Sequence, residues 1–330
     1  MKRTLLRVIK TGAALLGLGA VGLSAAVAFR QHRTFAAPLP DIHASLDPAV
    51  IERGRYLVYG PAHCADCHGP QPDSGKLDAG GEQPLVGGKE FHLPVGVFRV
   101  PNITTDPKHG IGRYSDPEIA RLLRHGVRPN GEGVLPFMPF ANLSSQDLTA
   151  VISFLRQQKP VAHEVLPHAP NVLGNIVMAF VLEPRGPSEP VRERVEPQAS
   201  AEYGRYLANS VANCVGCHTK IDMRTGAWAG PKFGGGALHP STSDPSQSFV
   251  TPNLTPHPSS GWLKGWNEDA FVARLKAGRV YEGSPMPWQA FKRMSDDDLR
   301  AIYRYLQTLP PAAGGPDPAD RRAVLQVAAR

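Results

Sequence analysis

All four cysteines of this 330-residue chain fall into two copies of one five-residue pattern, C-x-x-C-H. The first copy ends at His68 and the second at His218, so the pattern recurs after 150 residues. On a helix, this spacing places the two thiols of a copy one turn apart, with an imidazole directly after them. Any fold must therefore present the same three side chains twice, as Cys64, Cys67 and His68 and as Cys214, Cys217 and His218.

The sequence around each pattern is repeated as well, which indicates a duplicated unit rather than two unrelated motifs. Three further matches keep the same order at offsets of 148 to 151 residues. They pair Gly54-Arg55-Tyr56-Leu57 with Gly204-Arg205-Tyr206-Leu207, Pro101-Asn102-Ile103-Thr104 with Pro252-Asn253-Leu254-Thr255, and Met138-Pro139 with Met286-Pro287. The aromatic rings of Tyr56 and Tyr206 are expected to line a cofactor pocket or the core, as large aromatic side chains usually do.

Each copy also carries the same helix signals. A helix is predicted before each cysteine pattern, around residues 46–58 and 200–209. A loop rich in glycine and proline follows the pattern. The next helix is capped by Ser115 or Asn267 and stopped by Gly126 or Gly278, and the last helix starts near Ser144 or Ser295.

We therefore predict an all-α protein with two tandem domains after an N-terminal hydrophobic helix. The segments are an export or anchor segment over 1–33, a first domain over 42–160, a linker over 161–199, a second domain over 200–310 and a tail over 311–330. The apolar centre of the linker, from Val172 to Leu182, is expected to pack between the domains, and the tail is expected to be loose.

The N-terminal 33 residues hold six Lys and Arg residues, no acidic residue and a charge-free run over 11–29. The length of this run suits one membrane-spanning helix, whereas its glycines and the small residues Ala26-Val27-Ala28 suit a cleaved signal peptide. The length favours an uncleaved anchor in the inner membrane, and both interpretations place the remainder in the periplasm. There, the other 30 basic residues face 29 acidic ones, so the net charge does not indicate nucleic-acid binding.

Several chemistries use paired cysteines, and they differ in how much of the pattern they explain. A redox dithiol does not need the histidine, and a disulfide explains neither the histidine nor the repetition. A zinc site needs four ligands, of which each copy supplies three. Covalent haem attachment uses all three, because the thiols add to two vinyl groups of a porphyrin and the histidine binds the iron. The sequence therefore predicts two covalently bound haem c groups.

The second axial ligand decides whether each iron is saturated or open to a small molecule. Met138 and Met286 are the only methionines that recur between the copies, and each is followed by proline and an aromatic residue. We predict that they bind the irons opposite His68 and His218, whereas Met178, Met223 and Met294 fill gaps in the core. A second histidine on one haem is the alternative, and it would leave one Met-Pro pair unexplained.

The stretches GRYLVYGPAHCADCHGP and VPNITTDPKHGIGRYSDPEIARLLRHGV, with their counterparts GRYLANSVANCVGCHTK and TPNLTPHPSSGWLKGWNEDAFVARLKAG, resemble the cytochrome c subunit of membrane-bound alcohol and gluconate dehydrogenases. The resemblance covers about residues 50–158 and 200–310. It implies class I cytochrome c domains, each with one His/Met haem, which relay electrons from a dehydrogenase catalytic subunit toward quinone, another cytochrome or a terminal oxidase. Members of that family typically carry three haems, whereas this chain has two C-x-x-C-H motifs.

The leading hypothesis is therefore a dihaem electron-transfer protein without catalytic residues of its own. The alternative is a dihaem enzyme such as a cytochrome c peroxidase, in which one iron must keep an open or displaceable position. A gas-sensing or structural module is a third class. The matched Met-Pro pairs favour the electron carrier, because they predict the same saturated iron in both copies.

Overall fold

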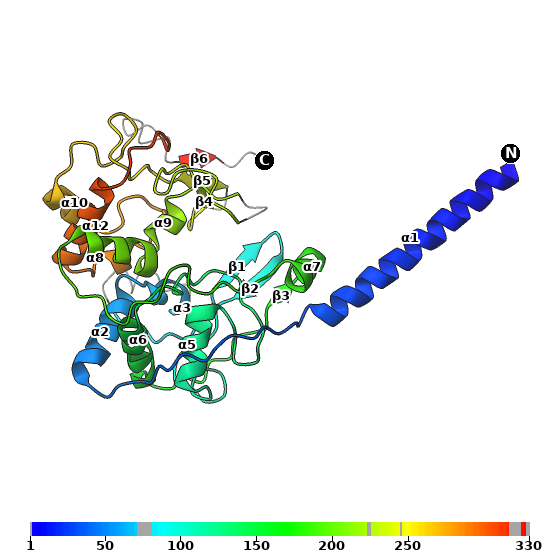
Figure 1. Cartoon of the computed structure of the whole chain (residues 1–330), viewed down its shortest axis with the longest axis horizontal. Coiled ribbons are helices and arrows are strands. Elements are labelled where there is room, and N and C mark those ends of the chain that lie inside the picture. Colours follow the sequence, from blue (N-terminus) through cyan, green and yellow to red (C-terminus); the bar gives the residue numbers. More distant parts are fainter. Residues whose placement is uncertain (1, 71–80, 223–225, 245, 317–324, 328–330) are drawn as a thin grey trace.

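The computed structural model of the protein describes residues 2–70, 81–222, 226–244, 246–316 and 325–327. Figure 1 shows helix α1 (Lys2–Arg30) extending away from the folded remainder of the chain. The helices of the first repeat (residues 42–160) lie on one side of the folded part, and those of the second repeat (200–310) lie on the other side (Figure 1). The N-terminal apolar helix predicted from the sequence is therefore present.

The repeats contain corresponding elements in the same order. Those of the first repeat are α2 (Pro48–Tyr59), α3 (Cys64–His68), β1 (Glu90–Leu93), β2 (Gly96–Arg99), α5 (Asp116–His125) and α6 (Ser145–Gln157). Those of the second are α8 (Ala201–Tyr206), the π-helical turn η1 (Leu207–Val211), α9 (Cys214–Cys217), β4 (Leu238–Pro240), β5 (Gln247–Val250), α10 (Glu268–Lys276), α11 (Trp288–Phe291) and α12 (Asp296–Gln307).

The helix ends follow the capping signals of the sequence. In α5, the backbone N–H of Ser115 donates to Glu118 Oε2 over 2.8 Å. In α10, the side chain of Asn267 accepts from the N–H of Ala270 over 2.9 Å. The hydroxyls of Ser144 and Ser295 accept from the N–H groups three residues later in α6 and α12. These local hydrogen bonds satisfy N–H groups that the first helical turn leaves without partners.

The first and last helices of each repeat pack together at a glycine. Helix α2 packs against α6 at Gly54, and α8 packs against α12 at Gly204. A Cβ atom at Gly54 would lie 1.9 Å from the carbonyl oxygen of Ala150, and one at Gly204 would lie 1.8 Å from that of Ala301. The repeated glycine is therefore required because the helix backbones approach more closely than any side chain would allow.

The prediction of an all-α protein was too narrow, because two three-stranded antiparallel sheets accompany the helices. Strands β1 and β2 form a hairpin in the first repeat, and β4 and β5 form one in the second. The third strand of each sheet comes from the segment after the repeat, namely β3 (Ala169–Pro170) and β6 (Leu325–Val327). These long-range pairings supply hydrogen bonds to backbone groups in loops whose composition suggested no regular structure.

The linker and the tail also differ from the expectations. Helix α7 (Val172–Phe180), in the apolar part of the linker, packs beside α1 and β3 rather than between the repeats. In the tail, the carbonyl oxygen of Ala312 accepts from Asn253 Nδ2 over 2.7 Å, and β6 pairs with β5. The described parts of the tail are therefore bound to the second repeat, because its Asn253 and β5 offer donors and acceptors that a sequence pattern does not reveal.

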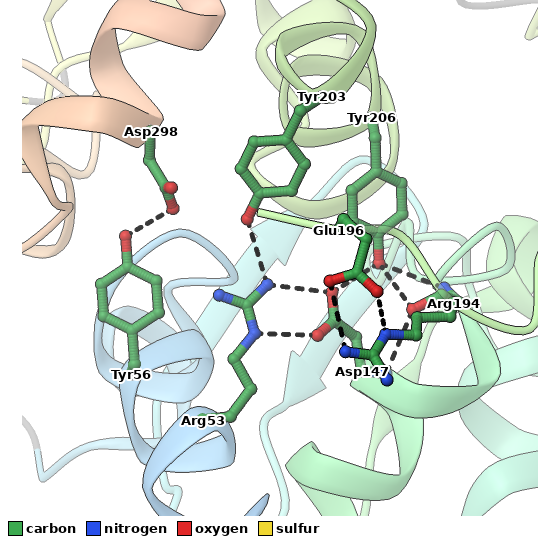
Figure 2. Close-up of polar contacts among 9 residues, drawn as sticks. Arg53, Tyr56, Asp147, Arg194, Glu196, Tyr203, Tyr206 and Asp298 are labelled. Carbon is green, nitrogen blue, oxygen red and sulfur yellow. Dashed lines mark hydrogen bonds and ion pairs between the residues drawn. The ribbon is translucent and has the colours of Figure 1, made fainter. Parts of the chain in front are cut away.

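The two repeats meet through a reciprocal pair of tyrosine–aspartate hydrogen bonds, shown in Figure 2. The hydroxyl of Tyr56 in α2 donates to Asp298 Oδ2 in α12 over 2.6 Å. The hydroxyl of Tyr206 in α8 donates to Asp147 Oδ2 in α6 over 2.7 Å. Since the two tyrosines match and the two aspartates match, the junction between the repeats has approximate twofold symmetry.

Candidate functional site

Each C-x-x-C-H pattern begins a very short helix, α3 or α9, directly after a residue in the left-handed conformation. His63 precedes Cys64 with a φ of 41°, and Asn213 precedes Cys214 with a φ of 51°. Asparagine and histidine are among the residues that tolerate this conformation best. The sharp bend turns the chain into the helix, so that the cysteines of each pair lie three residues apart on it.

The four cysteines form no disulfide with one another, so the structure does not support a disulfide within either pattern. In the chain before any cofactor is attached, burial raises the pKa of the Cys64 and Cys214 thiols to about 12. Within the described ranges, no three His, Cys, Asp or Glu side chains converge as a metal site would require. The zinc alternative therefore gains no support from the arrangement of these side chains.

The histidine of each pattern is buried and held by one hydrogen bond to a backbone carbonyl. His68 Nδ1 bonds to the carbonyl oxygen of Pro101 over 2.9 Å, and His218 Nδ1 bonds to that of Pro252 over 3.0 Å. A carbonyl only accepts, so Nδ1 carries the proton and Nε2 carries the lone pair. Burial lowers the pKa of each imidazole to about 4, so both rings are neutral at pH 7. This is the state that binds a metal ion.

The repeated Pro-Asn-x-Thr motif holds the carbonyl that orients each histidine. Asn102 is buried, and its Oδ1 accepts from the N–H and the hydroxyl of Thr104 over 2.9 and 2.8 Å. Asn253 makes the same bonds to Thr255 over 2.9 and 2.7 Å. The amide nitrogens of both asparagines donate to carbonyls of the segment after the repeat, at Val161 and Ala312. Outer hydrogen bonds of this kind orient the ligands of metal centres.

A glycine lies against the same motif in both repeats. Gly87 N–H donates to the carbonyl of His68 over 2.7 Å, and Gly235 N–H donates to that of His218 over 2.8 Å. Both glycines have φ near +70°, and a Cβ atom on either would come within 2.6 Å of the backbone of the Pro-Asn pair. Sequence reasoning missed these glycines and the asparagines, although the repetition of Pro-Asn-x-Thr was a visible signal for the latter.

The two methionines predicted as ligands lie partly buried against the apolar core that Cys64 and Cys214 also contact. Met138 and Met286 are thus in the same packed region as the cysteine patterns, and their coordination of iron stays a prediction. Met294 is buried in the core, as expected for a gap-filling side chain, and Met178 lies in α7. Met223 lies outside the described residues.

The cysteine pattern of the first repeat touches the methionine segment of the second. The ring of His63 packs edge-on against Phe291, with ring centres 5.8 Å apart. His63 directly precedes Cys64, and Phe291 ends the short helix α11 that follows Met286-Pro287. This aromatic contact places the residue before Cys64 against the helix after Met286. Tyr206 lies in the apolar core and Tyr56 packs against it, as expected, and their hydroxyls serve the junction between the repeats.

Comparison with known proteins shows what this chain is similar to. Residues 51–159 match the family model described as cytochrome c. The chain is 32% identical over 289 residues to the cytochrome c subunit of alcohol dehydrogenase (quinone) from Gluconobacter oxydans, covering 82% of this chain and 56% of the relative. It is 29% identical to the gluconate 2-dehydrogenase cytochrome c subunit of Pantoea cypripedii, covering 79% of this chain and 60% of that subunit.

A third relative is covered over most of its own length. It is a dihaem c-type cytochrome from Cereibacter sphaeroides, 29% identical over 285 residues that cover 82% of this chain and 89% of the relative. The chain spans a little over half the length of the two dehydrogenase subunits. The resemblance read from the motifs is therefore confirmed, and a cytochrome c domain implies covalently bound haem c.

Proposed function

Because this chain contains a cytochrome c domain and is related to the cytochrome c subunits of membrane dehydrogenases, we propose that it is a dihaem electron carrier of the periplasm. The observation that carries the proposal is the duplicated histidine geometry. In both repeats the imidazole is buried, neutral and held through Nδ1 by the carbonyl of a Pro-Asn-x-Thr motif. That arrangement leaves Nε2 in the form that an iron ligand needs.

The donor set of each repeat fits one haem c. In the first repeat, Cys64 and Cys67 would hold the macrocycle through thioether bonds, and His68 and Met138 would bind its iron. In the second repeat, Cys214, Cys217, His218 and Met286 would serve the same roles. When bound, each haem supplies a one-electron iron couple whose potential depends on its axial ligands and burial.

The residues of the chain contribute orientation and exclusion of water. The Pro101 and Pro252 carbonyls prevent the imidazoles from rotating, and the hydrogen bonds that they accept increase the basicity of Nε2. The prolines after Met138 and Met286 restrict the backbone beside a thioether, which is a weak ligand. The shared apolar core keeps water away from both sites, and that burial influences the potential of a bound haem.

The contact between His63 and Phe291 supports electron exchange between the two haems. It joins the residue before Cys64 to the helix after Met286, so each candidate site contributes one side of it. The repeats are also connected by Arg293, whose Nη2 donates to the carbonyl of Gly81 over 3.0 Å. A junction packed in this way would keep the distance between the haems constant during turnover.

We further propose that the donor is a membrane-associated dehydrogenase and that the acceptor is quinone, another cytochrome or a terminal oxidase. The support is that relatives over about four-fifths of the chain are cytochrome subunits of alcohol, gluconate and fructose dehydrogenases. Helix α1 is apolar and long enough to cross a membrane, and it would keep the carrier beside its partners. Two consecutive tandem domains over 42–160 and 200–310 complete the proposed organisation.

Spectroscopy of the purified protein tests the proposed haem count and ligands. We expect two haems per chain that stay attached after denaturation, with both irons low-spin and a sulfur-to-iron absorption band in the oxidised state. Met138→Ala and Met286→Ala should each remove about half of that band and open one iron to carbon monoxide. An unmodified protein that binds carbon monoxide readily at one haem would contradict the carrier role and favour a peroxidase-like enzyme.

Purification through an affinity tag on this subunit tests the proposed partner. The membrane fraction should release the chain together with a dehydrogenase catalytic subunit, and addition of that enzyme's substrate should reduce both haems. The variant Cys67→Ser combined with Cys217→Ser provides the matched control, because it should still bind the partner but lack normal haem attachment. Co-purification without substrate-dependent haem reduction would reject the proposed donor.

A further inference from the structure

Helix α7 is unusually apolar for a helix on the surface of an exported protein. From Asn171 to Leu182 the sequence contains no acidic and no basic residue. Its nine helical residues are Val-Leu-Gly-Asn-Ile-Val-Met-Ala-Phe, with Asn175 as the single polar side chain. Soluble surface helices normally carry charged residues on their outer face. The composition of α7 therefore indicates that its outer face contacts an apolar neighbour.

The structure shows which side of α7 is exposed. Gly174 and Ala179 are buried, and a Cβ atom at Gly174 would lie 2.0 Å from the carbonyl oxygen of Val95. Leu173 and Phe180 are seven residues apart on one face and are 51% and 41% exposed. The residues at the two ends, Val172 and Val181, are 78% and 64% exposed. One side of the helix thus packs on the protein while large apolar side chains cover the other.

The exposed helix is attached to the end of α1. Arg30, the last residue of α1, donates from Nε to the carbonyl of Ala179 over 3.4 Å, and its guanidinium lies 5.4 Å from the ring centre of Phe180. Arg33 donates to the carbonyl of Leu182. Arg30 thus bonds to a carbonyl in the last turn of α7 and Arg33 to one two residues beyond its end, where positive charge is favourable. Figure 1 shows α7 beside the inner end of α1.

This attachment determines the depth of α7 relative to a membrane that α1 crosses. The charge-free part of α1 ends at Phe29, one residue before the arginine that bonds to α7. Over 19 residues this part is roughly 28 Å long, which matches the hydrocarbon thickness of a bilayer. Residues after Phe29 therefore lie at the headgroup level, and α7 lies at that level with them.

We propose that α7 is a second membrane contact, which lies in the boundary between headgroups and acyl chains with Leu173 and Phe180 directed into the lipid. The proposal rests on the proposed membrane anchor α1. An apolar helix face gains free energy in this boundary region, and arginines beside it favour the lipid phosphates. The contact would restrict the angle between the folded part and the membrane, and so orient the haem domains toward membrane partners.

Spin labelling of the full chain in lipid nanodiscs tests this contact. The variants Leu173→Cys and Val181→Cys each add one thiol, and Leu238→Cys in β4 is the matched control because Leu238 is 61% exposed in the second repeat. We expect labels at 173 and 181 to be more accessible to oxygen than to a water-soluble nickel chelate by several-fold, and the label at 238 to show the reverse. Power saturation of the spin resonance signal measures both accessibilities.

The outcomes separate this proposal from the proposed function. Water-like accessibility at 173 and 181 in chains whose mass shows an intact α1 would overturn the membrane contact. Spin–spin broadening at 173 would also overturn it, because a second copy of the chain would then cover the helix. Loss of α1 by cleavage would overturn the anchor on which the inference rests. The proposed carrier role has its own test in the same experiment. If the wild-type protein, with no added cysteine, took up the spin label, its four thiols would be free of haem and the carrier role would be contradicted.

Discussion

At the junction between the repeats, the first repeat has Arg53 where the second has Tyr203. Arg53 donates from Nε to Asp147 Oδ1 over 2.9 Å and from Nη2 to Tyr203 over 3.2 Å, as Figure 2 shows. Asp147 therefore accepts from a cation and from Tyr206. The matching Asp298 accepts from Tyr56. On this side the position of Arg53 is taken by Tyr203, which provides no positive charge.

This difference shows how a duplicated unit can keep its geometry while its electrostatics diverge. Tyr56 and Tyr206 also accept from the backbone N–H of the serine that caps the facing helix, at Ser295 and Ser144. Burial raises the pKa of Asp298, in agreement with a carboxyl group that has weaker charge compensation. We infer that the Arg53 side of the junction contributes most to its stability.

The largest expected effect comes from removing the two aspartates separately. Asp147→Ala should lower the free energy of unfolding by about 3–5 kcal/mol, because it leaves the mostly buried Arg53 without its partner. Asp298→Ala should lower the free energy of unfolding by about 1–2 kcal/mol, since the group that loses its partner is the neutral hydroxyl of Tyr56. Urea unfolding of the haem-loaded protein, followed by circular dichroism, measures both losses. Equal losses would show that the charge difference between the two sides has no energetic consequence.

The next largest effect should be the same in both repeats. Gly54→Ala and Gly204→Ala each place a methyl group within 2 Å of a carbonyl oxygen in the facing helix. We expect each to cost about 3 kcal/mol, since the helices must separate to accommodate it. The same urea titration tests the equivalence, and Gly17→Ala in α1, where an added Cβ atom would meet no atom outside its own helix within 4 Å, is the control. A clear difference between the two variants would mean that the helix crossings are not equivalent.

Substitution of the two buried asparagines tests whether the hydrogen bonds that orient His68 and those that orient His218 act independently of each other. Asn102→Ala and Asn253→Ala should each cost about 2 kcal/mol, because buried backbone and threonine groups lose their partners. Each change should also raise the reduction potential of the haem in its own repeat, since a less firmly held carbonyl makes the histidine a weaker donor. Spectroelectrochemical titration should find the other potential unchanged. A shift of both potentials after either substitution would indicate that the hydrogen bonds of one repeat also influence the histidine of the other.

The smallest effect at neutral pH is expected at Tyr203, the residue that replaces the arginine. Tyr203→Phe removes the acceptor for Arg53 and should cost about 1 kcal/mol. Burial raises the pKa of Tyr203 to about 12 from 10.0, so above pH 10 the unfolded chain loses a proton that the native chain keeps. The native state therefore loses stability between pH 10 and about 12, by at most about 3 kcal/mol.

The measurement compares urea midpoints of the wild type and Tyr203→Phe at neutral and at alkaline pH. The variant should lose less stability than the wild type on the alkaline side, because phenylalanine has no proton to release. Tyr281→Phe, at a partly exposed tyrosine of the second repeat, controls for alkaline effects elsewhere. Parallel pH profiles of the Tyr203 variant and the wild type would contradict the assigned burial of this hydroxyl.

Features that depend on residues close together in the sequence were predicted well. The capping serines and Asn267 were found because a cap acts within one turn of its own helix. The C-x-x-C-H donor groups were also visible, since the cysteines and the histidine of each copy lie within five residues, and their binding of haem stays a prediction. The third strand of each sheet was missed because it comes from a segment far along the chain, as with β3, which pairs with β2.

The hydrogen-bond partner of Asn102 and the packing of the linker could not be read from a pattern. The amide of Asn102 donates to the carbonyl of Val161, 59 residues later, and no local signal indicates that partner. The apolar run from Val172 to Leu182 indicated burial, and only the position of α1 decided that it packs beside that helix with one face exposed. Hydrophobicity identifies a segment that needs an apolar neighbour but not which neighbour it finds.

The sequence by itself determined the chemistry of each repeat, because thiols, imidazole and caps act over a few bonds and a single helical turn. Only the tertiary structure decided how the repeats join, since Tyr56 and Asp298 are 242 residues apart and their contact depends on the packing of every element between them. The physical reason is the distance along the chain over which each interaction acts. Local spacing is set by the covalent backbone, whereas the register between two packed units is set by which buried polar groups find partners.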